Sequence, residues 1–182
     1  MLNVLWFVCC IPLITIGAST AALWDVILRR VRDEDPSIVR DFFGSFKVNF
    51  KRGTQSWGLI FGAGCLLTVN FTICHLFEEL QILELVFVAL FLCLIGLCQY
   101  LFPLVSQCDG TFRELIKTAA FLAVGYLPKT LMVTSVALLP VIAAFGISYG
   151  MFGVLLCVAF VVALAVWINA KVLSDIFSNF SM

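Results

Sequence analysis

Cysteine, histidine and the acidic residues are the side chains of this sequence that could build a metal, redox or catalytic site. The sequence has eight cysteines and one histidine, His75. Six of the cysteines fall inside apolar segments, where a free thiol packs as a small hydrophobe: Cys9, Cys10, Cys65, Cys93, Cys98 and Cys157. A structural zinc site needs about four convergent ligands, and Cys74 with His75 supplies only two. We therefore expect no metal site, no disulfide framework and no cofactor.

Residue sets for catalysis are as sparse as those for metal binding. The chain has neither a GxxxxGKS nor a GxxxxGKT motif to hold nucleotide phosphates, and its single histidine argues against a Ser/His/Asp set. A proton-coupled transporter normally needs a carboxylate buried in the membrane, and we identify none. We therefore expect no catalytic residues and a protein that is not an enzyme. The polar groups inside the apolar segments are Thr68, Asn70, Thr72, Gln99, Thr134, Ser135, Ser148 and Asn169.

Composition places the chain among membrane proteins. Hydrophobic residues make up 63% of the sequence and charged residues 12%, against roughly 45–50% and 25% in soluble globular domains. The longest uncharged run extends from Thr130 to Ala170, which is about 60 Å of α-helix at 1.5 Å per residue. Because the hydrocarbon core of a bilayer is roughly 30 Å thick, this run must cross it twice.

The apolar segments predict an all-α, polytopic membrane helix bundle that forms a single domain over residues 1–182. We place five transmembrane helices at residues 2–23, 54–76, 83–105, 118–140 and 149–170. The first segment lacks the basic start and the Ala-x-Ala site of a cleaved signal peptide, so we expect it to remain as a membrane helix. Helix breaks are expected where proline and its neighbours interrupt the helices, at Pro12, Thr15, Gly17, Pro103 and Pro128.

The distribution of charge predicts the orientation of the bundle. Seven of the eleven Lys and Arg residues lie between Arg29 and Arg52, and the 106–117 loop adds Arg113 and Lys117. The 77–84 turn carries three acidic residues and no basic one. Basic residues in short loops stay on the cytoplasmic side. We therefore expect the N-terminus outside and the C-terminus in the cytoplasm.

The first cytoplasmic loop, residues 25–53, is expected to contain an amphipathic elbow helix. Asp35 can cap a helix that begins at Pro36. A helical face with cations beside phenylalanines is typical of a helix lying in the membrane interface or docking a partner. Its apolar stripe is Val39, Phe42, Phe43, Phe46 and Phe50, and the cations beside it are Arg40, Lys47, Lys51 and Arg52.

The second cytoplasmic loop, residues 106–117, predicts a second elbow helix. Thr111 and Glu114 have the spacing of a capping box, and Arg113 with Glu114 forms a candidate docking surface. The loop faintly resembles the coupling loop of ABC importer permeases. The alternative, which we favour, is an interfacial elbow that only sets the angle of the next helix. Similarities between the two loop regions leave open whether they are a parallel repeat or a chance match.

Pairs of small residues four apart mark candidate faces for helix packing. Such pairs allow close approach of helices within a membrane. We expect them to pack helices within the chain, and the alternative is a seam between copies of it. The pairs are Gly58 with Gly62, Gly146 with Gly150, and Ala159 with Ala163.

A combination of short motifs connects the sequence to a known family. The motifs are Asn3-x-x-Trp6, Pro12-Leu13-Ile14-Thr15-Ile16-Gly17, Ala21-Ala22-Leu23, Asp41-Phe42-Phe43 with Phe46 and Asn49-Phe50-Lys51, Pro103-Leu104-Val105, and Leu127-Pro128-Lys129-Thr130-Leu131. Together they resemble the bacterial YesL family, across nearly the whole chain. The resemblance implies a bacterial plasma-membrane protein of about five helices. It also implies a gene that lies beside carbohydrate ABC importers and glycan-degrading enzymes.

Two functional hypotheses follow from these patterns and the resemblance. The first is an accessory or scaffolding protein of a carbohydrate ABC import system, with importer permease subunits, membrane lipid or further copies of itself as partners. The alternative is a small oligomeric permease or channel for a sugar or other small solute. We expect no nucleic-acid partner.

Overall fold

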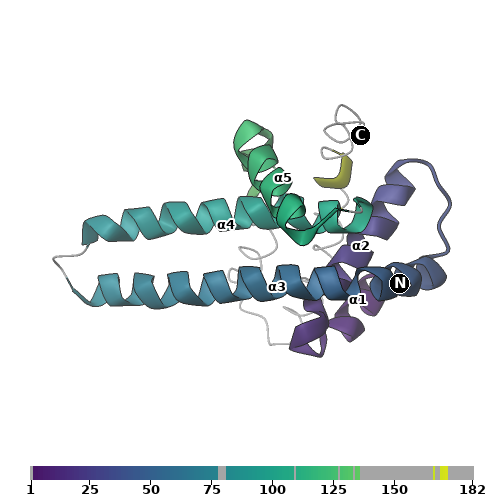
Figure 1. The fold of residues 1–182 in the computed structure, drawn as a ribbon, viewed down its shortest axis with the longest axis horizontal. Coiled ribbons are helices and arrows are strands. Elements are labelled where there is room, and N and C mark those ends of the chain that lie inside the picture. Colours follow the sequence, from purple (N-terminus) through teal and green to yellow (C-terminus); the bar gives the residue numbers. More distant parts are fainter. Residues whose placement is uncertain are drawn as a thin grey trace, which may run out of the picture.

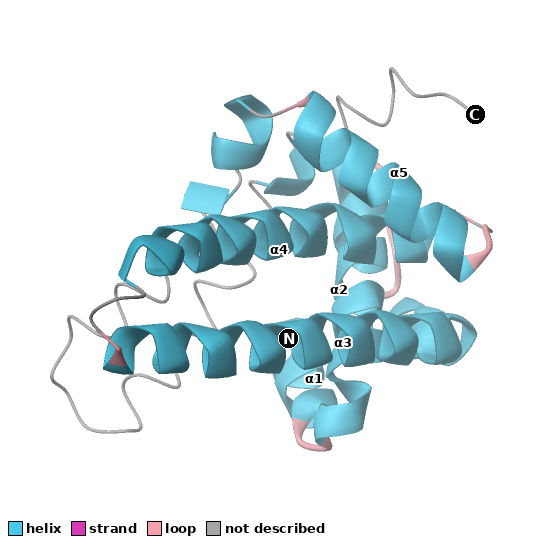
Figure 2. Ribbon diagram, turned by 60° about the vertical axis from the view of Figure 1, so that its left-hand side comes forward, coloured by secondary structure: helices cyan, strands magenta, loops and turns pink. Residues whose placement is uncertain are grey.

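The computed structural model describes residues 2–77, 81–108, 110–126, 128–132, 134–135, 166 and 169–171. Within these ranges the chain forms helices and short connections without any strand, in agreement with the predicted all-α class (Figure 2). The elements are α1 (Leu2–Cys10), the short 3-10 helix η1 (Leu13–Thr15), α2 (Ile16–Val31), α3 (Ile38–Leu76), α4 (Gln81–Gln107) and α5 (Phe112–Gly125).

The helices α3 and α4 form a long hairpin, in which they lie side by side (Figure 1). Both are long and apolar enough to cross a membrane, and only 11% and 22% of their most apolar windows are buried by the described chain. A core helix of a soluble protein would be mostly covered, so this exposure is consistent with a membrane protein. The hairpin contains the predicted spans 54–76 and 83–105.

The first predicted span, residues 2–23, is not a single helix. Helix α1 ends at Cys10, and the chain passes through η1 before α2 begins at Ile16. The hydroxyl of Thr15 donates to the carbonyl oxygens of Cys9 at 2.6 Å and Pro12 at 2.8 Å, which confirms the predicted break at Pro12 and Thr15. Nine residues of α1 extend only about 13 Å. The predicted span 2–23 is thus interrupted at Pro12, as expected, and its crossing of the membrane stays a prediction.

The chain turns back on itself at this break. The indole Nε1 of Trp6 donates to the hydroxyl of Thr20 at 3.3 Å. In a continuous helix these two residues would lie about 21 Å apart along the axis. The break thus packs α1 against α2.

Two glycines allow α2 to cross α3 with their backbones in contact. A Cβ placed on Gly17 would lie 2.6 Å from the Cβ of Trp57 and would also clash with the carbonyl oxygen of Gly53. A Cβ on Gly53 would lie 2.9 Å from the Cα of Ala18. Gly17 was predicted as part of the helix break, but it lies inside α2 and serves this crossing instead.

The first predicted loop, residues 25–53, is mostly helical. Helix α2 continues through Asp25 to Val31, and α3 begins at Ile38, so only residues 32–37 connect them. The N-cap residue of α3 is Ser37, and it makes no side-chain capping hydrogen bond, so the predicted cap at Asp35 is wrong. The predicted elbow is wrong too, because α3 continues without a turn from the amphipathic segment into the span. Gly53, the one weak helix former at this junction, keeps a negative φ.

Helix α4 continues through Pro103 to Gln107, so the predicted break at Pro103 is wrong. A proline inside a helix removes one backbone hydrogen bond. The side chains around it hold the helix in place, since Tyr100 to Val105 are all buried. In addition, the Ser106 hydroxyl donates to the Pro103 carbonyl oxygen at 2.8 Å.

The second predicted elbow is present as α5, which packs on α4 (Figure 2). The backbone N–H of Thr111 donates to Glu114 Oε2 at 2.9 Å, and the predicted capping box forms. Helix α5 ends at Gly125 and helical structure resumes at Pro128, so the interruption predicted at Pro128 is confirmed. The predicted span 118–140 therefore begins inside α5, and its residues 136–140 lie outside the described ones. Of the span 149–170, only residues 166, 169 and 170 are described.

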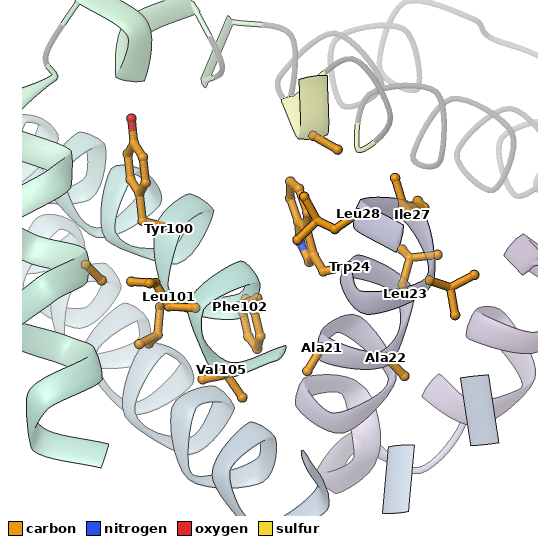
Figure 3. Packing of buried hydrophobic residues seen from close by; sticks show 14 of the residues in the cluster. Ala21, Ala22, Leu23, Trp24, Ile27, Leu28, Tyr100, Leu101, Phe102 and Val105 are labelled. Carbon is orange, nitrogen blue, oxygen red and sulfur yellow. The ribbon is translucent and has the colours of Figure 1, made fainter. Parts of the chain in front are cut away.

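The apolar core lies where α2 packs between the N-terminal part of α3 and the C-terminal end of α4. Its side chains come from all sides of α2 and from the last turns of α4 (Figure 3), together with Phe42 of α3 and Leu115, Ala119 and Leu122 of α5. Leu23 and Leu28 of α2 are at most 1% exposed, as are Tyr100 and Leu101 of α4. Trp24 of α2 belongs to this core as well. Helix α2 therefore determines which part of the hairpin is buried by protein.

Candidate functional site

Helix α2 carries a carboxylate into the protein interior. Asp25 is only 4% exposed. Its Oδ1 accepts a hydrogen bond from Arg29 Nε at 3.3 Å, one helical turn later, and another from Gln107 Nε2 at 3.0 Å. Because Gln107 is the last residue of α4, this carboxylate ties α2 to the end of the hairpin. Asp25 is buried by protein, in the segment predicted as the first cytoplasmic loop, so the absence of a carboxylate buried within the membrane stays a prediction.

Helix α3 faces Asp25 with small and polar side chains. Its buried positions recur at helical spacing and are Phe42, Ser45, Asn49, Gly53 and Ser56. Within this face, Asn49 Nδ2 donates to the Ser45 hydroxyl at 3.1 Å. The side chain of Asp41 is half-buried one turn before Ser45. Two amide or hydroxyl groups and a second carboxylate thus stand across from α2.

These groups surround a cavity of about 250 Å³, which we call the polar cavity. Its lining comes from α2, α3 and the end of α4, and includes Asp25, Arg29, Asp41, Ser45, Asn49 and Gln107. Cys108 also lines the cavity, and its carbonyl oxygen accepts a hydrogen bond from Arg52 Nη1 at 3.3 Å. The cavity thus lies between helices that are held together by hydrogen bonds across long sequence separations.

The lining of the polar cavity is suited to binding. It contains carboxylates, amides, hydroxyls and one guanidinium, all of which recognise ligands through hydrogen bonds and charge. The one histidine of the chain lies at the opposite end of the hairpin, where His75 Nδ1 is 2.9 Å from Glu84 Oε1. A histidine base is therefore not available to the hydroxyls that line the cavity.

The residues predicted for membrane-interface or partner docking divide between two environments. Arg40, Phe43, Lys47 and Phe50 are exposed on α3, with Phe43 at 42% and Phe50 at 40%. Phe42 is fully buried in the core. Phe46 is half-buried, and its ring stacks on Phe42 at a centroid distance of 6.4 Å. The exposed members form a face that alternates cations with aromatic rings.

The docking residues predicted on the second elbow are both exposed near the start of α5. Arg113 and Glu114 point away from the core, whereas Leu115 is 3% exposed and belongs to it. This arrangement repeats that of the first loop, where Arg40 is exposed and Phe42 is buried. The structure places the two sets of docking residues on separate helices.

The predicted packing glycines of α3 have no described neighbour. No described residue lies within 4 Å of a Cβ placed on Gly58 or Gly62. The residues Gly146, Gly150, Ala159 and Ala163 lie outside the described ones. Packing at these pairs therefore stays a prediction, while the observed close crossing uses Gly17 and Gly53.

Sequence reasoning missed the residues that build the polar cavity. Asp25 and Arg29 are four residues apart, as are Ser45 and Asn49, and this spacing places each pair on one helical face. The pairs were counted only as loop residues. The four-residue spacing would have indicated a shared helical face only if the helix had been predicted to continue past residue 23, as α2 does.

Comparison with known proteins adds one finding. A family model described as "Protein of unknown function, DUF624" matches residues 1–71. No curated protein and no solved structure matches the chain. The matched region covers α1, α2 and most of α3, and therefore both glycines of the crossing. Proteins of the YesL type, which the sequence resembles, belong to DUF624.

Proposed function

We propose that this protein is an accessory or scaffolding integral membrane protein that assists a bacterial carbohydrate ABC import system. It crosses the plasma membrane five times, with its N-terminus outside and its C-terminus in the cytoplasm. The carbohydrate part of this proposal is based on the resemblance to the YesL family. The docking part is based on the exposed face of α3.

The arrangement of the basic segments supports this orientation. Arg52 reaches the carbonyl of Cys108, and Asp25 reaches Gln107, so both basic segments lie at the same end of the hairpin. The last turn of α3, with His75, and the first turn of α4, with Glu84, lie at the other end of the hairpin (Figure 1). Under the positive-inside rule, the end that carries the polar cavity faces the cytoplasm.

The length of α3 is the observation that carries the docking proposal. This helix has 39 residues and is about 58 Å long, against roughly 30 Å for the hydrocarbon core. If residues 54–76 span the membrane, residues 38–53 project about 24 Å beyond it. The projecting part exposes Arg40, Phe43 and Lys47 on one face while the opposite face packs on α2. Such a face fits acidic headgroups of lipid near the membrane and an acidic subunit surface beyond it.

Co-purification in mild detergent tests this proposal. The wild-type protein, the double variant Arg40→Gln/Lys47→Gln and the control Lys117→Gln are compared, because Lys117 is an exposed cation on another helix. We expect importer permease subunits to be recovered with the wild type and the control, and at reduced yield with the double variant. Equal recovery with all three proteins, or absence of permeases from the wild-type sample, would refute the docking role.

The polar cavity favours a second candidate, a small oligomeric permease for a sugar or another solute. Charged groups that face the interior of a helix bundle or a water-filled cavity mark solute and ion pathways, and Asp25 lines the polar cavity at the cytoplasmic end of such a pathway. Flux into liposomes that contain only this protein would support the permease. Its loss in Asp25→Asn, with flux retained in Asp35→Asn, would place the pathway at the cavity. Vesicles that remain impermeable would leave the accessory role as the better account.

A further inference from the structure

We propose that the polar cavity binds a small organic ammonium ion. This inference is independent of the docking role and of transport, because it concerns only what the cavity walls recognise. It follows from the acceptors that the walls present, from their net charge and from the size of the space.

The walls of the cavity present mostly hydrogen-bond acceptors. Both hydrogen bonds to Asp25 go to Oδ1, so its Oδ2 has no partner among the described residues. Asn49 uses Nδ2 to donate to Ser45, which leaves its carbonyl oxygen as an acceptor. Gln107 likewise donates through Nε2 and retains Oε1. An ammonium group has three donors and no acceptor, and it therefore complements these walls.

The charge of the lining also favours a cation. Asp25 and Asp41 contribute two negative charges, and Arg29 contributes one positive charge. Arg29 already pairs with Asp25, whereas the carboxylate of Asp41 makes no ion pair with the described part of the chain. Arg52 donates a hydrogen bond to the carbonyl oxygen of Cys108. A buried carboxylate is stable only when it is paired and hydrogen-bonded, and a cation beside Asp41 and Asp25 Oδ2 completes that pairing.

The volume restricts the ligand to a few heavy atoms. About 250 Å³ holds roughly eight water molecules at about 30 Å³ each. This is below the roughly 300–1,000 Å³ of pockets for drug-sized ligands. A short amine fits the space, and a disaccharide does not.

The side chains of the lining argue for an organic ammonium rather than a divalent metal ion. No group of three or more His, Cys, Asp or Glu side chains that could hold a metal ion occurs among the described residues, and the Asp25 carboxylate is already paired with Arg29 at 3.3 Å. An ammonium group needs only hydrogen-bond acceptors. Its three N–H donors can also reach acceptors on α2, α3 and α4 separately.

Isothermal titration calorimetry on the detergent-purified full-length protein tests the inference. The probe is ethanolammonium, and ethylene glycol is its matched neutral control, since the two differ by one amine in place of a hydroxyl. We expect ethanolammonium to bind at least about tenfold more tightly than ethylene glycol, the factor expected for a hydrogen bond to a charged group. No heat of binding with ethanolammonium, or equal affinities for the two compounds, would overturn the proposal.

Two variants connect binding to the cavity. Asp41→Asn removes the charge of a side chain without a described partner, and Asp35→Asn is the matched control in the exposed 32–37 connection. We expect Asp41→Asn to bind ethanolammonium at least about tenfold more weakly and Asp35→Asn to bind it normally, with both proteins eluting as the wild type in gel filtration. Unchanged affinity in Asp41→Asn, or displacement of ethanolammonium by Mg²⁺, would show that the cavity is not an ammonium site.

Discussion

The two halves of the α3–α4 hairpin have opposite environments. In the half near α2, Tyr100, Leu101 and Val105 are at most 1% exposed. In the far half, Leu76 is 73% exposed and Leu85 is 76% exposed. Composition separates the two halves of α3, because the charged residues of that helix lie in its first half, but it does not separate the similarly apolar halves of α4. The difference is produced by α2, which covers only one of them.

Polar side chains are buried in the near half of the hairpin, whereas those of Thr68 and Thr72 in the far half are exposed. Asp25, Ser45 and Asn49 are buried near α2, where Asp25 accepts a hydrogen bond from Gln107 and Asn49 donates one to Ser45. In the far half, the hydroxyls of Thr68 and Thr72 donate to carbonyl oxygens one turn earlier in the same helix. The Asp25 side chain thus joins two helices, whereas the Thr68 and Thr72 side chains bond only to the backbone of their own helix.

The largest expected effect comes from adding a side chain at the crossing of α2 and α3. Replacing Gly53 with Leu forces α2 and α3 apart, because a Cβ at this position already meets the Ala18 backbone at 2.9 Å. We expect a loss of at least about 3 kcal/mol in stability, measured by thermal unfolding in detergent. The control Gly58→Leu should cost less than about 0.5 kcal/mol. Equal losses in the two variants would show that the crossing is not a special contact.

A pair of leucine truncations tests the comparison between the halves directly. Leu101→Ala in the near half removes a fully buried side chain and should cost about 2–4 kcal/mol. Leu85→Ala in the far half removes one that the described chain leaves exposed, and should cost less than about 1 kcal/mol. Unfolding in the same detergent measures both. If Leu85→Ala were as destabilising as Leu101→Ala, protein rather than lipid would cover the far half.

Removal of the buried carboxylate should have an intermediate effect. Asp25→Ala leaves Arg29 and Gln107 without their shared acceptor, and we expect a loss of about 2 kcal/mol. Because Arg29 is 43% exposed at its side chain, water compensates part of the lost pairing. Asp35→Ala is the control, with a change below about 0.5 kcal/mol. A neutral result for Asp25→Ala would mean that the contact between α2 and α4 is not stabilising.

The smallest effect is expected at the far end of the hairpin. His75 is 74% exposed at its side chain where it meets Glu84, and exposed ion pairs contribute roughly 0–1 kcal/mol. We therefore expect His75→Ala to change the unfolding temperature less than any of the near-half variants. A loss as large as that of Asp25→Ala would indicate that the far end has a structural role of its own.

Features determined by local sequence were predicted correctly. The break at Pro12 with Thr15, the capping box of Thr111 and Glu114, and the two long apolar helices all depend on residues close together in the chain. The break assigned to Pro103 failed because burial against α2 and α5 outweighs the loss of one backbone hydrogen bond. That burial depends on tertiary packing, which cannot be predicted from the presence of a proline in the sequence.

The candidate site was less predictable, because charge was used as a marker of loops. Asp25 and Arg29 look like the start of a cytoplasmic loop, yet they belong to the same helix as Ala21 and Trp24. The phenylalanine stripe presented a similar ambiguity. Phe42 and Phe43 are adjacent and equally apolar, and only the position of α2 determines which of them is buried.

Because α3 is one uninterrupted helix, its two ends are rigidly connected through the contact with α2 at Gly53. Gly53 lies 15 residues after Ile38 and 23 residues before Leu76, so the two arms measure about 23 Å and 35 Å. A tilt of about 10° around this point moves the two ends by roughly 4 Å and 6 Å in opposite directions. If α3 tilts as one rigid body, a displacement of the end at His75 is accompanied by a displacement of the opposite sense at the end that carries Arg40.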